Sequence, residues 1–466
     1  MQGEYRGDFT RDSFDPAKRF LRVLYQQGRV QLDADFNEQA SILLHYLQSL
    51  AKDLFGPFGG PCESGFLIVP TGAPDKDFKI GAGHYYVDGI LCEVEETEAD
   101  GQKLVLTYLT QPDYPAPATL ENNKTYLVYL DVWERHITYI EDDGIREVAL
   151  GGPDTATRAK VVWQVKVENK LADDFPSITK DNVIGDNWGE WVKLWQPANR
   201  GQLKAKSKEV SGQETEPCIT SPESRYRGAE NQLYRVEIHT GGKAGDGATF
   251  KWSRENGSVT FPIQELEGNT VVLEHLGRDS RFSLAPGDWV EIVDDEYILQ
   301  GRAEPLLQVD AIDPDTRKVT LKGIPTSTVG QAPEKHPLLR RWDHKAGKST
   351  EGGLELMDGA AKIVEGVNGN NWLLLEDGVM VQFQPGETYR SGDYWLIPAR
   401  TATGDVEWPG PVGEPDPLPP HGIKHHYAPL AIINVASNGD VTLPGGADAD
   451  LRSEKTLVVR HVNYAT

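Results

Sequence analysis

Residues Lys18 to Phe55 read KRFLRVLYQQGRVQLDADFNEQASILLHYLQSLAKDLF, and this stretch contains the one long helical pattern that we find in the chain. Its apolar side chains recur at steps of three and four, which is the spacing of one face of a helix. They are Phe36, Ala40, Leu43, Leu44, Leu47, Leu50, Ala51 and Leu54. Asp35, followed by Glu38, predicts the helix start, because a carboxylate there accepts amide hydrogens of the first turn. Gly56-Pro57 predicts the end, so we expect an amphipathic helix over residues 34–55, about 30 Å long.

The residues that precede this helix are polar and follow no period. We expect residues 1–15 to form an extended arm whose aromatic side chains dock on another surface. Together with the helix, this arm makes a first module over residues 1–60 that serves assembly. The candidate interface residues of the module are Phe9, Phe14, Phe20, Tyr25, Arg29, Phe36, Leu43 and Leu47.

The length and the charge of the chain limit the possible functions. Its 466 residues exceed what one hydrophobic core usually holds, so length alone predicts roughly two to four domains. Lys and Arg number 47 against 71 Asp and Glu, which gives a formal net charge of −24. Such an acidic chain repels phosphate backbones, which argues against a nucleic-acid partner. Glutamates follow the short basic run Lys204–Lys208, and we interpret this run as a solvated loop.

The cysteines and the first residues bear on the compartment. Cys62, Cys92 and Cys218 are scattered and form no CxxC motif, so we expect three buried thiols in a reducing cytoplasm, with one disulfide as the alternative. The first residues are polar, and no apolar run approaches the ~20 residues that span a bilayer. We therefore expect neither a signal peptide nor a membrane helix. The protein is expected to stay cytoplasmic until assembled, and to leave the cell by lysis or within a particle.

Beyond the helix the pattern changes to short β runs separated by Gly, Pro and Asp. Asp88-Gly89 and Asp377-Gly378 predict two-residue hairpin turns. Residues 126–138 are mostly apolar on both faces, which predicts a central strand. The Gly-rich loop over residues 241–247 lacks the Gly-Lys-Ser/Thr ending of a phosphate-binding loop, so we interpret it as the tip of a hairpin.

These patterns predict a mainly β, multidomain protein of sandwich or small-barrel modules, with an N-terminal extended arm and one long amphipathic helix. After the module over residues 1–60, the predicted units are a β domain over 61–224, a small barrel-like domain over 225–335 and a C-terminal β region over 336–466. A Pro-rich linker over residues 408–422 is expected to be extended and exposed.

Four segments carry a resemblance to known proteins. They are DFTRDSFDPAKRFLRVLYQQGRVQLDADFNEQ (residues 8–39), YLVYLDVWERHITY (126–139), ENQLYRVEIH (230–239) and FKWSRENGSV (250–259). These segments resemble an uncharacterised domain family associated with extracellular contractile injection systems and phage-tail-like particles, and the similarity runs over most of the chain. The first segment also resembles, more loosely, the start of phage baseplate and fibre proteins. The resemblance implies membership of a multi-subunit particle and supplies no catalytic residue.

Three tryptophans, Trp188, Trp191 and Trp195, lie close together in a polar stretch that we expect to be rich in loops. Flat aromatic side chains of this kind stack on sugars, close the end of a β domain or meet a neighbouring subunit. We favour packing over ligand binding, and we keep a cell-surface glycan as the alternative ligand.

The best place for a metal is the cluster His421, His425 and His426, with Asp343 and His344 as distant partners. A tetrahedral site needs three or four ligands on a rigid frame, whereas this cluster follows a Pro-rich segment and has no acidic residues in register. We therefore interpret it as a solvated group on a loop, and we expect no metal or other cofactor. No Gly-x-Ser-x-Gly, His-Glu-x-x-His or Walker motif occurs, so we expect no enzymatic activity.

The sequence thus predicts a non-enzymatic structural subunit of a contractile injection system or phage-tail-like particle, which docks through its arm and helix. The expected partners are further copies of the chain, in a three- or six-fold arrangement, and other subunits of the particle. One alternative is a carbohydrate-binding receptor or fibre module of such a particle. A sugar-active enzyme is the less favoured alternative, because it needs two carboxylates at a defined separation in a sugar cleft.

Overall fold

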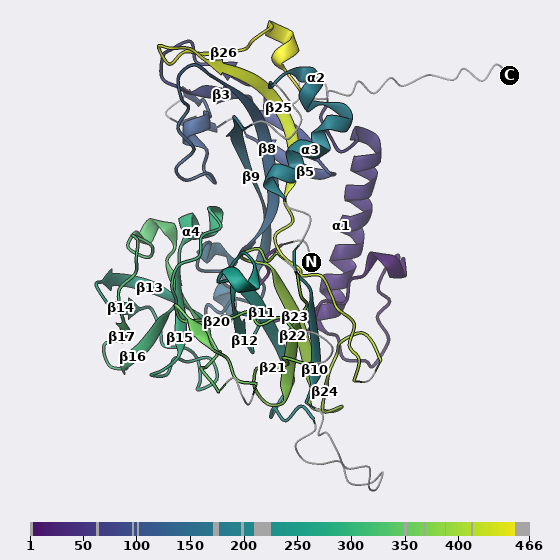
Figure 1. The fold of residues 1–466 in the computed structure, drawn as a ribbon, viewed down its shortest axis with the longest axis vertical. Helices are drawn as coiled ribbons and strands as arrows, with labels where there is room; N and C mark the ends of the chain where they lie inside the picture. Colours follow the sequence, from purple (N-terminus) through teal and green to yellow (C-terminus); the bar gives the residue numbers. More distant parts are fainter. Residues whose placement is uncertain are drawn as a thin grey trace, which may run out of the picture.

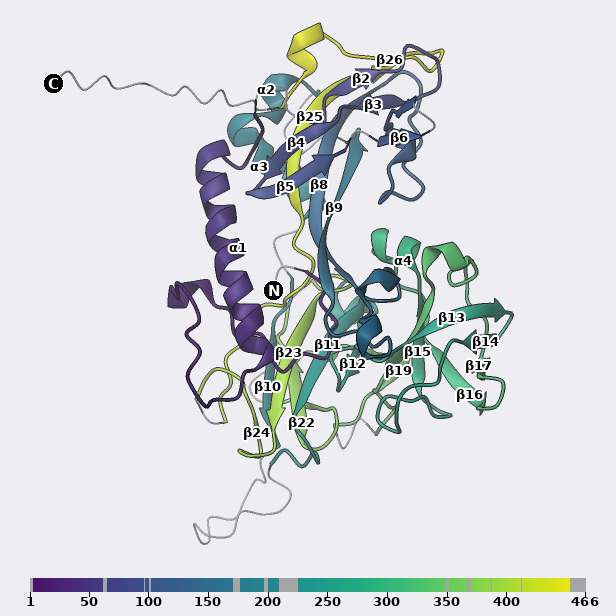
Figure 2. The same cartoon turned by 180° about the vertical axis from the view of Figure 1, so that it is seen from behind.

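The computed structural model describes residues 3–61, 65–95, 97–99, 102–170, 177–196, 200–208, 225–348, 352–366, 370–386, 388–411 and 413–452. Strands dominate this part of the chain and form several separate sheets (Figures 1 and 2). The predicted fold class, a β-rich multidomain protein with few helices, is confirmed. The α-helices of the described residues are α1 (Asp33–Phe55), α2 (Lys180–Val183), α3 (Trp188–Trp195) and α4 (Asp295–Leu299).

One half of the molecule is built around a four-stranded sheet with the order β26-β25-β8-β9. Its strands are β8 (Lys124–Ile137), β9 (Arg158–Glu168), β25 (His426–Val435) and β26 (Val441–Thr442). Strand β8 is buried along most of its length between β9 and β25, which confirms the predicted central strand. Three smaller sheets complete this half, with strands β1 (Phe58–Gly59), β4 (Gly83–Val87), β5 (Ile90–Val94), β2 (Ile68–Pro70), β3 (Phe78–Ile80), β6 (Thr97–Ala99) and β7 (Gln102–Leu104).

The other half contains a six-stranded sheet and a three-stranded sheet that share one core. The first has the order β19-β20-β12-β11-β23-β24 and the second the order β10-β22-β21. Their strands are β10 (Leu203–Ser207), β11 (Gln232–Thr240), β12 (Thr249–Ser253), β19 (Leu356–Met357), β20 (Ala360–Lys362), β21 (Leu373–Leu374), β22 (Val379–Phe383), β23 (Tyr394–Arg400) and β24 (Asp405–Val406). The basic run Lys204–Lys208 thus lies mostly in β10, paired with β22, so the predicted solvated loop is wrong. Lys204 and Lys206 alternate with the buried Leu203 and Ala205, and this alternation is typical of a strand. The prediction rests on the charges of the run and not on the alternation.

A closed six-stranded barrel, with the order β13-β14-β17-β16-β15-β18, lies beside this sheet (Figure 2). Its strands are β13 (Thr260–Glu267), β14 (Thr270–Leu273), β15 (Trp289–Val293), β16 (Leu307–Asp313), β17 (Lys318–Lys322) and β18 (Leu338–Trp342). The barrel closes through the pairing of β18 with β13 and β15, so it extends past the predicted range 225–335. Strands β11 and β12, which fall inside that range, belong to the six-stranded sheet instead.

Strands that are distant in the sequence share sheets in both halves. β25 and β26, from the predicted C-terminal region, complete the sheet of β8 and β9, and β22 pairs with β10. The described units therefore do not follow the consecutive ranges 61–224 and 336–466. Pairing between distant strands leaves no local pattern in the sequence, which is why the boundaries drawn from composition differ.

Helix α1 lies along one edge of the molecule, beside both halves (Figures 1 and 2). It covers the predicted residues, but the predicted cap is wrong, because Leu32 is the N-cap residue and no side chain caps the first turn. Asp35 lies inside this turn, and Glu38 accepts a hydrogen bond of 2.6 Å from the Ser13 hydroxyl. The helix ends at Gly56, as predicted, where φ is 82°.

The segment expected to form an extended arm for docking on another surface contacts the body of its own chain at its first described residues. The backbone carbonyl of Gly3 accepts a hydrogen bond of 2.8 Å from the Tyr394 hydroxyl. The carbonyl of Gly7 accepts one of 2.9 Å from the Asn256 amide. Arg6, which lies between these residues, is buried and forms ion pairs with carboxylates of the chain itself. These ion pairs hold the N-terminal segment against the body.

Candidate functional site

The outer face of α1 is apolar and exposed to solvent. Of the helix side chains only Ala34 and Ile42 are buried, whereas Leu47 is 64 % exposed. The other exposed large apolar side chains of the helix are Phe36, Leu43, Leu44, Tyr46, Leu50 and Leu54. Three of the predicted interface residues, Phe36, Leu43 and Leu47, therefore share one exposed face. Contiguous apolar surface of this kind marks interaction sites in soluble proteins.

The opposite face of α1 contacts the chain itself through Ala34 and Ile42, which are buried, and through polar groups. Lys52 Nζ lies 2.6 Å from Asp88 Oδ1 in the turn between β4 and β5. Gln39, at the border of the apolar face, accepts through its carboxamide oxygen a hydrogen bond of 2.8 Å from the backbone N–H of Val23. An amphipathic helix usually buries most of its large apolar side chains, whereas α1 buries Ile42 and leaves seven of them exposed.

The segment before α1 extends this exposed apolar surface. Its exposed apolar side chains are Phe20, Leu21, Leu24, Tyr25, Val30 and Leu32. The Tyr25 ring lies 5.2 Å from the Phe36 ring, so the segment runs against the first turns of the helix. We call these six side chains, together with the seven exposed ones of α1, the docking surface. Arg29 is also exposed on this segment.

Two predicted interface residues lie elsewhere. Phe9 is half-buried, and its ring lies 6.4 Å from that of His136 in β8. Phe14 is half-buried as well, with its ring 5.8 Å from that of His45 in α1. Both aromatic side chains hold the N-terminal segment against its own chain, so they do not belong to the docking surface.

A cluster of buried charges anchors the N-terminal residues. The Arg6 guanidinium meets Glu237 of β11, which also binds Arg235 Nε at 2.6 Å. Lys251 of β12 lies 3.3 Å from Glu237 and 2.7 Å from Glu291 of the barrel strand β15. Burial alone would raise the pKa of Glu237, but the three cations hold it well below its ordinary value. The cluster thereby joins the N-terminal segment, the six-stranded sheet and the barrel.

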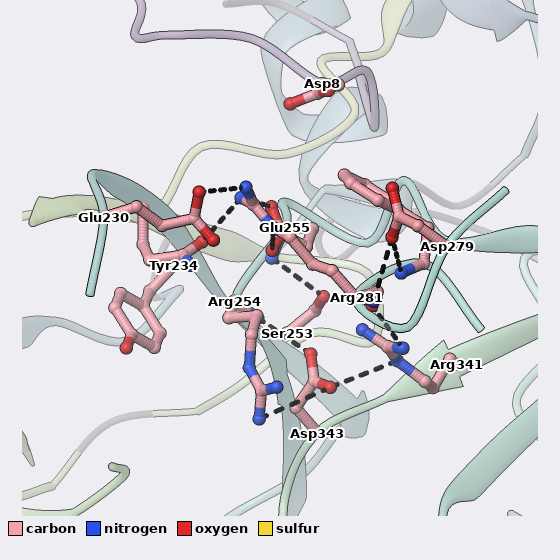
Figure 3. A network of polar contacts seen from close by, with 12 residues as sticks. Asp8, Glu230, Tyr234, Ser253, Arg254, Glu255, Asp279, Arg281, Arg341 and Asp343 are labelled. Atoms are coloured by element: carbon pink, nitrogen blue, oxygen red, sulfur yellow. Dashed lines mark hydrogen bonds and ion pairs between the residues drawn. The ribbon is translucent and has the colours of Figure 1, made fainter. Parts of the chain in front are cut away.

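A second polar network surrounds the loop between β12 and β13 (Figure 3). Arg281, from the barrel, binds Glu255 through hydrogen bonds of 2.5 and 2.6 Å. The backbone N–H of Arg254 donates to Asp343 at 2.9 Å, and its guanidinium binds Glu376 at 2.9 and 2.8 Å. These partners come from the barrel, from the residue after β18 and from the turn between β21 and β22. The loop therefore ties three elements together.

Arg340 of β18 lies close to the first cluster and differs from its neighbours. Its side chain is 7 % exposed, and its Nε atom is buried with no hydrogen-bond partner among the described residues. Burial and the nearby Arg6 lower the pKa of Arg340 to about 10. With Arg6 and His136 it lines a hollow of about 30 Å³, enough for one or two water molecules.

Three of the four segments that carry the resemblance meet at these clusters. Residues 126–139 contribute His136, residues 230–239 contribute Arg235 and Glu237, and residues 250–259 contribute the loop with Arg254 and Glu255. Their carboxylates are held by one to three cations each. A buried carboxylate held in this way is stabilised in its charged form and is poorly suited to transfer a proton. Sequence reasoning missed this role, because only the pairing of distant strands brings the charges together.

The three tryptophans lie on helix α3 and in its N-terminal turn, and not in a loop as predicted. Trp191 is fully buried, and its indole N–H donates a hydrogen bond of 2.7 Å to the Asn182 carbonyl. The Trp195 ring stacks on Tyr129 of β8 at 3.8 Å, and Trp188 contacts Trp195 edge-on. The indoles thus pack α3 against the sheet of β8, and Trp191 presents no face to a sugar.

The histidine cluster also differs from its prediction as a solvated loop. His425 Nδ1 lies 2.7 Å from Asp131 of β8, and the buried His426 lies 2.7 Å from Asp88. The acidic partners that the sequence seemed to lack come from strands far away in the chain. Within the described residues no group of three or more His, Cys, Asp or Glu side chains is arranged to hold a metal ion. Cys92 is buried, as predicted, whereas Cys62 and Cys218 lie outside the described residues.

Comparison with known proteins gives one match. A family model matches residues 5–179 and 196–440, which is most of the chain. The chain belongs to this family, DUF6519, whose description is a family of unknown function. No curated protein and no solved structure matches the chain significantly. Among the described residues, no helix has the length and apolar character needed to cross a membrane.

Proposed function

We propose that this DUF6519 chain is a non-enzymatic structural subunit of a multi-subunit particle, and that it joins its neighbours through the docking surface. The observation that carries the proposal is the outward orientation of the apolar face of α1, which leaves seven large apolar side chains of the helix exposed. Burying the thirteen exposed apolar side chains would contribute on the order of 10 kcal/mol, before the cost of association. That gain is large enough to support a stable contact.

The class of particle rests on the resemblance of the four segments to proteins of contractile injection systems and phage-tail-like particles. We propose that further copies of the chain and other subunits of such a particle are the partners. The protein would be cytoplasmic until assembly and particle-associated afterwards. Because the buried charge clusters join the sheets and the barrel, the body would act as one rigid support for α1.

The proposal is tested by replacing one side chain of the docking surface with a charge. Leu47→Glu is expected to leave the melting temperature unchanged within about 2 °C, since Leu47 is mostly exposed and contributes little to folding. Its amount in particles purified from the producing cells should fall at least tenfold. Leu150→Glu, at a site that is 67 % exposed in the connection between β8 and β9, is the matched control and should be incorporated normally.

Two results would contradict the proposal. One is a Leu47→Glu protein that enters particles as well as the wild type. The other is a wild-type chain that is found in no particle fraction and stays a monomer of 51.6 kDa.

A further inference from the structure

We propose that the outer face of α1 packs against the same face of two further copies of the chain, forming a parallel three-helix bundle on a three-fold axis. This inference rests on the proposed function, because it names the occupant of the docking surface. The occupant follows from the spacing, the width and the charge of that face.

The spacing of the exposed residues is that of a coiled-coil seam. Ala40, Leu43, Leu47, Leu50 and Leu54 follow one another at alternating steps of three and four, and all of them are exposed. With Leu43 and Leu50 at d positions, Ala40, Leu47 and Leu54 occupy a positions. A repeat of 3.5 residues keeps one narrow line of a helix in contact with a parallel partner helix of the same repeat.

The width of the apolar face favours three helices over two. The positions beside the seam, e and g, carry Leu44 and Tyr46, which are about half exposed, and Ala51, with Gln39 and Asp53 at the two ends. In a two-helix coil these flanking positions stay partly in water and are commonly charged. From Tyr46 to Leu44 the face covers roughly 160° of the helix circumference at 100° per residue. Two neighbours cover that arc, whereas one neighbour covers only its centre.

The charge distribution is compatible with contact between identical copies. Each chain carries a net charge of −24, so most of its surface repels another copy. Between Phe36 and Ala51 the only formal charge is Glu38, which is half-buried and bonded to Ser13 away from the seam. Over this part of the helix copies meet without like charges opposing each other, and the acidic side chain that borders the seam is Asp53, at a g position beside Leu54.

The preceding segment adds to this compatibility. Lys18, Arg19, Arg22 and Arg29 are exposed, and none forms an ion pair with a described residue. Residues 18–32 contain no acidic side chain. A cationic patch beside the seam of an otherwise acidic chain attracts the acidic body of the adjacent copy.

The area of the outer face also indicates that the interface includes residues beyond α1 and involves more than one neighbouring copy. A 23-residue helix is about 34 Å long and half its circumference is about 16 Å, which gives a face of about 500 Å². A stable interface buries about 800 Å² on each partner. The exposed side chains of residues 20–32 supply the remainder, and two neighbouring helices use the whole width of the face.

Sedimentation equilibrium of the full-length protein at micromolar concentration tests the stoichiometry. The wild type is expected at three times 51.6 kDa. Leu47→Glu, which puts a charge in the seam, should reduce the mass threefold. The double variant Leu44→Lys and Tyr46→Lys should lose the trimer and give two copies or one, since the flanks are buried only in the trimer. Leu150→Glu should remain a trimer.

The outcomes separate this inference from the proposed function. A wild-type dimer, or a trimer that persists in Leu47→Glu, overturns the three-helix bundle. A wild-type monomer whose Leu47→Glu variant is lost from particles overturns the bundle and leaves the proposed function standing, with another subunit on the docking surface. A wild-type monomer whose variant is incorporated normally overturns both.

Discussion

Gly89 and Gln48 are in direct backbone contact: a Cβ atom on Gly89 would lie 2.0 Å from the carbonyl oxygen of Gln48. Gly89 is the second residue of the β4–β5 turn, and its φ of 84° is in the left-handed region. Gln48 lies in the middle of α1. The middle of α1 thus packs directly on the β4–β5 turn. This close approach is possible because Gly89 has no side chain.

Gly89→Ala should displace α1 from the β4–β5 turn. The left-handed backbone costs an alanine about 1–2 kcal/mol, and the clash with Gln48 adds to that cost. Hydrogen exchange should accelerate in α1 more than in the barrel strands. Gly151→Ala is the matched control, since Gly151 has a φ of 90° and no atom within 4 Å of an added Cβ. Equal exchange in α1 for both variants would show that the helix does not depend on this contact.

Glu237→Gln should be among the most destabilising conservative substitutions in the chain. It leaves Arg6, Arg235 and Lys251 buried around a neutral side chain, and breaking a buried ion pair costs about 3–5 kcal/mol. Urea unfolding followed by tryptophan fluorescence measures the loss. Glu190→Gln, which removes an exposed pair with Lys193, should change stability by less than about 1 kcal/mol. Similar midpoints for the two variants would contradict an anchoring role for Glu237.

Arg340→Met should behave in the opposite way. Its Nε atom is buried without a hydrogen-bond partner among the described residues, so its removal relieves a desolvation cost that the nearby carboxylates Glu291, Glu4 and Glu237 offset only in part. We expect a stabilisation of about 1–3 kcal/mol in the same unfolding experiment. A loss of more than 1 kcal/mol would mean that Arg340 has a partner when the protein is in solution.

Stability should fall as the pH drops below about 6.5. Burial lowers the pKa of His136 to about 3, with Arg6 and Arg340 adding to the effect, and burial lowers the pKa of His239 and of His344 to about 4. These folded-state values lie below the unfolded value, so the stabilisation is complete above pH 6.5. It is lost as the unfolded chain takes up protons that the folded chain excludes.

The expected slope is about 1.4 kcal/mol per pH unit for each histidine, between pH 6.5 and about 4. Urea midpoints at pH 7.5, 6.0 and 5.0 measure it. His344→Gln should reduce the slope by about a quarter, because burial also lowers the pKa of His421 to about 4, and His84→Gln, at an exposed position, is the control. Midpoints that stay constant down to pH 5.0 would contradict the burial of neutral histidines.

Local features of this fold could be predicted from the sequence. The helical period over residues 34–55 located α1, and Asp88-Gly89 located the β4–β5 turn, where both residues have a positive φ. The glycine-rich loop after β11 is a hairpin tip, as expected. Each of these features depends on residues that are close together in the chain, so the pattern and the structure share the same cause.

Long-range features could not be predicted in this way. The carboxylates Asp88 and Asp131 meet His426 and His425 only because β25 pairs with β8. Arg6 reaches Glu237 only because the N-terminal segment crosses β11. The sequence did indicate the apolar face of α1, but a helical period does not tell whether that face turns inward or outward. Contact of the opposite face with the β4–β5 turn, through the Gln48 backbone and the Lys52–Asp88 pair, decides the matter.

The pairing of β25 with β8 has a consequence for folding during synthesis on the ribosome. Strand β8 is synthesised long before its partner, so a nascent chain carries an open, apolar strand edge until residue 435 has left the exit tunnel. His426, which contacts the turn beneath α1, arrives at the same late moment. A chain interrupted before that point lacks both the partner strand and this support. We therefore expect a polypeptide that ends before β25 to hold its helix less firmly, which under the proposed function would disfavour its incorporation.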